Sequence, residues 1–193
     1  MYTIVTTPHP ILIQASEPVK SFDKKLQTIL QEMEETLLAT TDPKGVGLAA
    51  PQVGLPLRIF LAKPTDKSDV TVYINPIMEQ MSQEEGILAH PNSERIEKAK
   101  PKKSKGKLLE GCLSIPNIWG NVTRKKEVTL TWQDNTGKKR TKHFKGFMAT
   151  IIQHEVDHLN GILFTKHVME QGEKLYKSHK NEEGEDEFDE VKI

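Results

Sequence analysis

Apolar residues recur at helical spacing in two segments of the chain. In residues 22–38 they follow one face of a helix, with mostly polar residues between them, and they are Leu26, Leu30, Met33, Leu37 and Leu38. In residues 147–159 the same spacing aligns Met148, Ile151, Ile152, Glu155 and Leu159. We therefore predict two amphipathic helices. The second should stop at Asn160-Gly161, because glycine readily takes the left-handed conformation that ends a helix.

Strand patterns occupy the segments between these helices. Residues 58–62 and 70–75 are short and rich in Ile, Val, Phe and Tyr, which predicts strands. Residues 128–133 alternate like a half-buried strand, and a turn at 134–137 with a return strand to Phe144 predicts a hairpin. The glycines and proline of residues 45–54 indicate a loop that leads into extended chain. The expected fold is α+β, with small antiparallel or mixed sheets around the helix of residues 147–159.

Charge gathers in two places. Within residues 79–107, which we interpret as an exposed, mobile insertion, residues 94–107 hold seven Lys or Arg and two Glu. Order should resume at Leu108. Residues 168–180 are charged and expected to be helical, and residues 181–193, with seven acids and one lysine, are expected to be a solvated tail. The predicted organisation is a catalytic domain over residues 1–166, followed by a charged C-terminal helix and acidic tail over residues 167–193.

Composition restricts the class of protein. A chain of 193 residues favours one domain, and a formal net charge of zero argues against a surface built for nucleic acid or anionic lipid. The single cysteine, Cys112, cannot form a disulfide within the chain, so a reducing compartment fits best. We find no signal peptide and no run approaching the ~18 apolar residues of a membrane span. The expected location is the cytoplasm, away from membranes.

His154-Glu155-Val-Asp-His158 is an H-E-x-x-H pattern. On a helix, residues four apart share one face, so both imidazoles can reach one ion. Glu155 lies close enough to take a proton from a metal-bound water, whose pKa the metal lowers from ~15.7 to about 7. The pattern alone is short and also arises on solvated charged helices. The apolar residues before it imply burial, which favours a divalent-metal site.

Two histidines leave a tetrahedral catalytic site in need of a third protein ligand and an open position for water. The nearest downstream acid is Glu170, in a polar stretch. Upstream, Cys112 stands in Glu110-Gly-Cys112-Leu-Ser114, at a loop or strand end. A thiolate is a good ligand for zinc or ferrous iron, whereas a lone cysteine is by itself more often a small buried hydrophobic residue. Cys112 is therefore a candidate third ligand.

Three segments together resemble the signature motifs of the peptide deformylase family. They are residues 45–52, Gly-Val-Gly-Leu-Ala-Ala-Pro-Gln, residues 110–114, Glu-Gly-Cys-Leu-Ser, and residues 153–161, Gln-His-Glu-Val-Asp-His-Leu-Asn-Gly. The likeness covers about residues 8–164. The chain departs from the family pattern in its long insertion before Cys112, at Trp119, where a basic residue or glycine is common, and at Thr123, where proline is common.

The resemblance implies removal of the formyl group from the N-terminal formyl-methionine of nascent polypeptides, with release of formate. It implies that Cys112, His154 and His158 hold one divalent ion, natively Fe2+, with Zn2+, Ni2+ or Co2+ as substitutes. Glu155 would be the general base and then the acid. The Gln52 side chain and the Leu113 backbone N–H would stabilise the oxyanion, and glycines at 45 and 47 would let the substrate backbone approach closely.

Two other functional classes fit part of the pattern. A general metallopeptidase would share His154, Glu155 and His158 but should carry its third ligand downstream. A non-catalytic module with a structural metal should have four protein ligands. The basic stretch of residues 98–107 could contact ribosomal RNA or could be a solvated loop. The remaining histidines have no ligand partner at useful spacing, and we expect surface or loop positions for His9, His90, His143, His167 and His179.

Overall fold

The computed structural model describes residues 1–86, 109–181, 184 and 186–192. Its helical elements are η1 (Pro10–Ile13), α1 (Lys24–Leu38), η2 (Ala50–Val53), α3 (Phe147–Leu159) and α4 (Phe164–Glu170). Its strands are β1 (Gly47–Ala49), β2 (Ile59–Ala62), β3 (Thr71–Met81), β4 (Glu85–Gly86), β5 (Glu110–Cys112), β6 (Ile115–Gly120), β7 (Arg124–Lys125), β8 (Glu127–Gln133), β9 (Lys139–Lys145), β10 (Leu175–Lys180) and β11 (Asp186–Glu190). The fold is α+β, as predicted.

Helix α1 confirms the first amphipathic prediction. The Asp23 side chain caps it by accepting a hydrogen bond of 3.0 Å from the backbone N–H of Leu26. Four residues of its predicted apolar stripe are buried, whereas Leu38 at its end is 51% exposed. Leu30 and Met33 pack in one core with Leu61 of β2. This packing places α1 against the sheet that contains β2.

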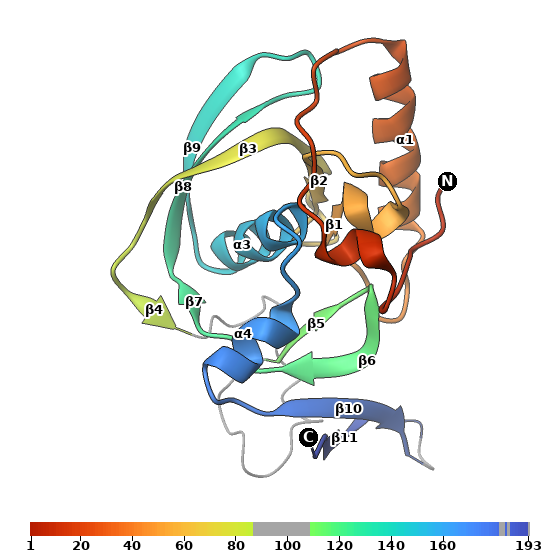
Figure 1. The fold of residues 1–193 in the computed structure, drawn as a ribbon, viewed down its shortest axis with the longest axis vertical. Coiled ribbons are helices and arrows are strands. Elements are labelled where there is room, and N and C mark those ends of the chain that lie inside the picture. Colours follow the sequence, from red (N-terminus) through yellow and green to blue (C-terminus); the bar gives the residue numbers. More distant parts are fainter. Residues whose placement is uncertain (87–108, 182–183, 185, 193) are drawn as a thin grey trace.

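A five-stranded antiparallel sheet, ordered β1-β2-β3-β8-β9, curves around α3. Figure 1 shows α3 lying inside this curve. The buried face of α3, including Ile152 and Leu159, belongs to the same core as Phe60 of β2 and Tyr73 of β3. The hairpin predicted at residues 128–144 is confirmed as β8 and β9. The helix that bears the H-E-x-x-H pattern is thus the centre of the molecule.

Helix α3 has the bounds that its periodicity predicts. It ends at Leu159, Asn160 is its C-cap, and Gly161 follows with a φ of +70°. A side chain at position 161 would also meet the backbone of Ile13, because its Cβ would lie 2.6 Å from the carbonyl carbon. Glycine is required here both by conformation and by the close approach of η1.

The C-terminal prediction was wrong in its details. The helix over residues 168–180 stops at Glu170 as α4, and residues 175–180 form β10, which pairs with β6. The segment expected to be a solvated tail contains β11, which pairs with β10 in a four-stranded sheet ordered β11-β10-β6-β5. Basic side chains of this hairpin meet acidic ones across the strands, as in Lys180 with Asp186 at 2.7 Å. These opposite charges stabilise the pairing of two strands. Because they come from two different segments, the pattern of either segment alone does not predict the pairing.

The first residues of the predicted insertion, 79–86, include strand. Residues 79–81 continue β3, and β4 pairs with β7 in a separate two-stranded sheet. The resumption of order at Leu108 and the basic stretch 98–107 fall outside the described residues.

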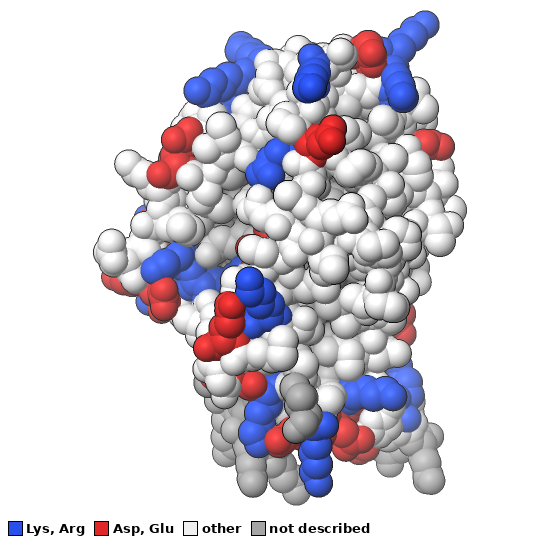
Figure 2. Space-filling model, viewed as in Figure 1, with Lys and Arg blue, Asp and Glu red and all other residues white. Residues whose placement is uncertain are grey.

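Surface charge on the face seen in Figure 2 is mixed. Acidic and basic side chains are interspersed there, without a broad area of one sign. This agrees with the formal net charge of zero. Among the described residues, no helix is long and apolar enough to cross a membrane.

Candidate metal centre and active site

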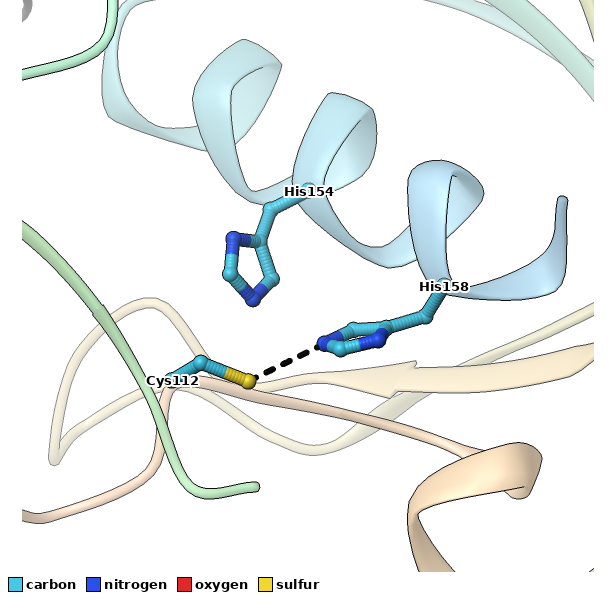
Figure 3. A group of neighbouring side chains, drawn as sticks. All are labelled: Cys112, His154 and His158. Atoms are coloured by element: carbon cyan, nitrogen blue, oxygen red, sulfur yellow. Dashed lines mark hydrogen bonds between the residues drawn. The ribbon is translucent and has the colours of Figure 1, made fainter. Parts of the chain in front are cut away.

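The structure brings Cys112, His154 and His158 together. Cys112 ends β5, while the two histidines project from adjacent turns of α3 toward it, as Figure 3 shows. All three side chains are buried, and their candidate ligand atoms lie within 4.8 Å of one another. Cys112 Sγ is 3.1 Å from His158 Nε2. The mid-chain cysteine and the late helix therefore form one site, as the sequence predicted.

The chemistry of this group fits a divalent metal ion. One sulfur and two imidazole nitrogens form a donor set typical of zinc or ferrous iron. Within the described parts of the chain, the group contains these three donors. Three protein ligands are characteristic of catalytic sites, because water or substrate can take the remaining position.

A buried network holds His154 in orientation. Its Nδ1 lies 2.6 Å from Glu110 Oε1, so Nε2 is the nitrogen turned toward the site. Glu110 accepts two hydrogen bonds of 2.8 and 2.7 Å from Arg124. Arg124 also donates to Asp157 at 2.8 Å, and Asp157 contacts His167 at 2.9 Å. The network links β5, β7, α3 and α4 around the candidate ligands.

Opposing effects set the charge of this network. Burial by itself would raise the pKa of Glu110, but the Arg124 guanidinium and its hydrogen bonds, with His154, hold that pKa well below its ordinary value. Burial would likewise lower the pKa of Arg124, yet its two carboxylate partners raise it. Glu110 is therefore a carboxylate and Arg124 a cation, and each stabilises the other inside the protein.

Glu110 and Asp157 stand within the motifs, but the sequence alone assigned no role to them or to Arg124. Glu110 stands two residues before Cys112, on the same short strand. Arg124 is 6% exposed, which is unusual for an arginine without partners. Only the folded arrangement shows that its two carboxylates come from β5 and α3.

Glu155 lies buried beside the histidines. Its Oε2 atom has no hydrogen-bond partner within the described structure. Burial raises the pKa of this carboxyl to about 7, partly offset by the charge of His154. A buried carboxyl with an unpaired oxygen and a pKa near neutrality can both accept and return a proton.

Gly45 and Gly47 occupy different surroundings. A Cβ at position 47 would lie 2.2 Å from Oε1 of Glu155, so this glycine makes room for the carboxylate. A Cβ at position 45 would lie 2.9 to 3.0 Å from side-chain atoms of Leu37, Leu113 and Thr40. Both glycines line the cleft. Neighbouring protein atoms leave no room for a side chain at either position, whether or not a substrate is bound.

Gln52 is a buried residue of η2 with a fixed amide orientation. Its Oε1 accepts a hydrogen bond of 2.8 Å from the backbone N–H of Ala49. Its Nε2 consequently faces Cys112 Sγ at 3.4 Å and Ser114 Oγ at 3.3 Å. Leu113, the residue after Cys112, also lines the cleft. The amide donor thus lies beside the sulfur, and Leu113 is the next residue of the chain.

A cleft of about 880 Å³ opens over this group. Residues 41–47 and 63–66 line one part of it, and residues of α3 another. The remaining wall comes from β5, β6 and the β10–β11 hairpin, including Trp119 and Phe188. The site is therefore accessible to an extended molecule larger than a single amino acid.

The other histidines in the described residues lie outside the ligand group. His9, His143 and His179 are exposed, as predicted. His167 differs, because it is half-buried and contacts Asp157. His90 falls outside the described residues.

Comparison with known proteins agrees with this geometry. A sequence model of the polypeptide deformylase family matches residues 1–174. The peptide deformylase of Wolinella succinogenes is 40% identical over 164 residues, which is 85% of this chain and 86% of the relative. That of Campylobacter jejuni is 37% identical over 193 residues, covering 93% of this chain and 97% of the relative. The crystal structure of the Thermotoga maritima peptide deformylase has a TM-score of 0.71 at 31% identity, with coverage of 86% of this chain and 97% of that one.

Peptide deformylases are metalloenzymes, and in this chain the Cys112, His154 and His158 group has the donors that such an enzyme needs. The chain therefore belongs to the polypeptide deformylase family, whose enzymes remove the formyl group from the N-terminus of nascent polypeptides.

Proposed function

We propose that Cys112, His154 and His158 form the catalytic metal centre for the removal of the formyl group from formyl-methionyl peptides. The single observation that carries this proposal is the meeting of one thiol and two imidazoles beside the buried carboxyl of Glu155, at the base of an open cleft. The reaction hydrolyses one amide bond, and its products are formate and a free N-terminal amine.

We infer that the native ion is Fe2+ and that Zn2+, Ni2+ or Co2+ can replace it. A set with one thiolate and two imidazoles suits each of these borderline ions, and the resemblance of the motifs favours ferrous iron. When bound, the ion supplies Lewis acidity, which polarises the formyl oxygen and lowers the pKa of water. Glu110, through its contact with His154 Nδ1, increases the basicity of that imidazole.

Glu155 is the proposed general base. Its unpaired Oε2 can accept a proton from the attacking water, and the same carboxyl can then donate that proton to the leaving nitrogen. A pKa of about 7 suits both roles near neutral pH. The absence of a side chain at Gly47 leaves room for the carboxylate in this position.

Gln52 and Leu113 are the proposed oxyanion donors. When water attacks the formyl carbon, negative charge develops on its oxygen, and a preoriented donor typically contributes ~3 kcal/mol to stabilising it. The Ala49 N–H holds Gln52 so that Nε2 points to the site, which supports its role. The Leu113 backbone N–H follows directly after the sulfur ligand. Gly45 and Gly47 are proposed to contact the substrate backbone along the opposite edge of the cleft.

The two competing classes are less well supported. A metallopeptidase with a downstream ligand would need an acid such as Glu170, but this residue is exposed at the end of α4. A structural metal module would need a fourth donor, and the group within the described residues has three. The arrangement favours hydrolysis at an open metal site.

The decisive experiment combines metal analysis with a formate-release assay. Protein purified without oxygen should contain about one ion per chain, and it should release formate from formyl-Met-Ala-Ser. It should leave casein uncut, because internal peptide bonds are not its substrates. A metal-loaded preparation that is inert toward formyl peptides would refute the function.

The substrate also determines where the enzyme must work. Formylated nascent chains arise where translation begins with formyl-methionine, and we propose the cytoplasm as the site of action. The six lysines within residues 98–107 suggest a contact with ribosomal RNA. Co-sedimentation with ribosomes that weakens as salt rises would support this contact, and association independent of salt would contradict it.

A further inference from the structure

One wall of the cleft is built from side chains that the deformylation chemistry does not use. Gly111, Trp119, Ser178 and Phe188 belong to the four neighbouring strands β5, β6, β10 and β11. Gly111 pairs with Trp119, and Ser178 pairs with Phe188. On β10 the register partner of Trp119 is Tyr176, and Ser178 lies two residues farther along that strand. Because paired residues share a face of the sheet and side chains alternate along a strand, the four side chains lie on one face, with Ser178 diagonal to Trp119.

Three contacts fix the indole of Trp119. Its ring lies over Gly111, where a Cβ would be 2.6 Å from the ring atom Cε3. Its Nε1 donates a hydrogen bond of 3.0 Å to Ser178 Oγ. Its centroid lies 6.1 Å from that of Phe188, with the planes at 81°, an edge-to-face arrangement. Trp119 and Phe188, here called the aromatic wall, are therefore preorganised.

The aromatic wall faces the cleft. Both rings are half-buried, and both line the same cavity as Cys112 and His154. Charged groups around them are partly neutralised, since Lys180 pairs with Asp186 and Lys44 pairs with Asp66. The two rings offer a bound peptide an uncharged aromatic surface. A ring or aliphatic side chain would lose less solvation on this surface than a charged one.

The outer half of the wall lies beyond the part of the chain common to the family. The family match ends at residue 174, whereas Ser178 and Phe188 belong to the hairpin that follows. The hairpin is attached to β6 through β10, and it extends the sheet that presents Cys112. Figure 1 shows β10 and β11 as the layer next to β6.

From these contacts we propose that the aromatic wall binds an apolar or aromatic side chain at the second or third residue of the formylated peptide, so that the C-terminal hairpin determines substrate preference. This inference rests on the proposed function of the neighbouring centre. Extended peptide advances about 3.3–3.6 Å per residue, so residues just after the formyl-methionine can reach surface adjoining the ligands. The contact lies away from the reacting atoms and stabilises ground state and transition state alike, so it should act mainly on KM.

The first test compares three substrates, formyl-Met-Phe-Ser, formyl-Met-Ser-Phe and formyl-Met-Ser-Ser. The parent enzyme should cleave at least one phenylalanine peptide with a kcat/KM ~5–10-fold above that of the serine peptide, a ratio expected for one aromatic contact. Phe188→Ala should reduce this ratio to below about twofold, through a rise in KM for the phenylalanine peptide. Asp189→Ala is the matched control, because residue 189 is adjacent on β11 but exposed and outside the cleft lining.

Several results would overturn the inference. They are a ratio near one in the parent, an unchanged ratio in Phe188→Ala, or a preference for formyl-Met-Ser-Glu over the phenylalanine peptides. An inactive parent on all formyl peptides would refute the proposed function instead. Trp119→Phe, which keeps a ring but removes the donor to Ser178, should lower the preference less than Phe188→Ala does.

A binding measurement tests the wall independently of catalysis. The chain has two tryptophans, and Trp132 lies buried in the core of the five-stranded sheet. In a Trp132→Phe background, fluorescence reports on Trp119 alone. Met-Ser-Phe should change this emission at lower concentration than Met-Ser-Ser, and Phe188→Ala should abolish the difference. Equal titrations of both peptides in the Trp132→Phe protein would contradict the proposal.

Discussion

Gly47 lies directly against Glu155, at a distance that leaves no room for a single added carbon. The Cβ of an alanine at position 47 would be 2.2 Å from Oε1 and 2.7 Å from the carboxyl carbon. The glycine of the first motif is thus coupled sterically to the proposed base of the third. The coupling joins β1 to α3, two elements about a hundred residues apart in the chain.

Gly47→Ala is expected to displace the Glu155 carboxylate and to lower kcat by at least about 100-fold, since general base catalysis typically contributes 10²–10⁴-fold. Metal content should remain near one per chain, because no ligand moves directly. Formate release and metal analysis check these outcomes together. Gly86→Ala is the control, because its Cβ would meet only the flexible end of Lys126. Parental kcat in Gly47→Ala would contradict the steric coupling.

Glu155→Ala should bind the metal normally and lose turnover by about 10²–10⁴-fold, because the proton acceptor is removed and the ligands remain. Glu155→Gln, which preserves the shape of the side chain, should be equally inactive. Single-turnover formate release and metal stoichiometry are the measurements. A Glu155→Ala enzyme that hydrolyses at the parental rate would refute the assignment of the base.

Cys112→Ala should release the metal or leave it inactive, since the remaining imidazoles form an incomplete site. Removal of the ion from the parent by a chelator should abolish turnover and lower Tm, because an ion that binds only the folded state stabilises it. Readdition of the ion should restore both properties in the parent but not in Cys112→Ala. Full activity of the cysteine variant would exclude the sulfur as a ligand.

Glu110→Gln is expected to weaken metal affinity by about 10–100-fold, because the carboxylate that orients His154 is replaced by a neutral amide. Competition with a metal indicator measures this change. Glu85→Gln is the matched control, since Glu85 forms an exposed ion pair with Lys125. Equal affinities in the two variants would show that the contact with His154 Nδ1 does not tune the ligand.

Arg124→Ala should lower the free energy of unfolding by about 3–5 kcal/mol, because it leaves the buried carboxylates of Glu110 and Asp157 without a cation. Urea unfolding provides the measurement. Arg140→Ala removes an arginine that pairs with Asp134 at the surface, and its stability should stay close to that of the parent. Similar losses in both variants would contradict the importance of burial.

The periodicity of the chain was sufficient to predict the helix that carries the two histidine ligands and the hairpin that packs near it. Helix α3 has the predicted bounds, and a spacing of four residues places His154 and His158 on one face whatever the helix packs against. The hairpin of β8 and β9 follows from alternation and a turn signal in the same way. These are local properties, set by the geometry of the backbone within one turn or one hairpin.

The local sequence pattern could not predict the structure of the C-terminal segment. Leu175 and Tyr176 form a strand because β6 offers backbone hydrogen bonds and because β11 supplies opposite charges across from β10. Strand pairing depends on segments that are distant in the chain, so a charged stretch can be read as a helix when its partner is unknown.

The sequence by itself determined the ligand types, their spacing on α3 and the family to which the chain belongs. Only the tertiary structure decided that Gly47 leaves room for Glu155, that Arg124 joins Glu110 to Asp157, and that Phe188 completes the wall begun by Trp119. The physical reason is that residue spacing fixes geometry within an element, whereas contacts between elements depend on how all of them pack into a common core.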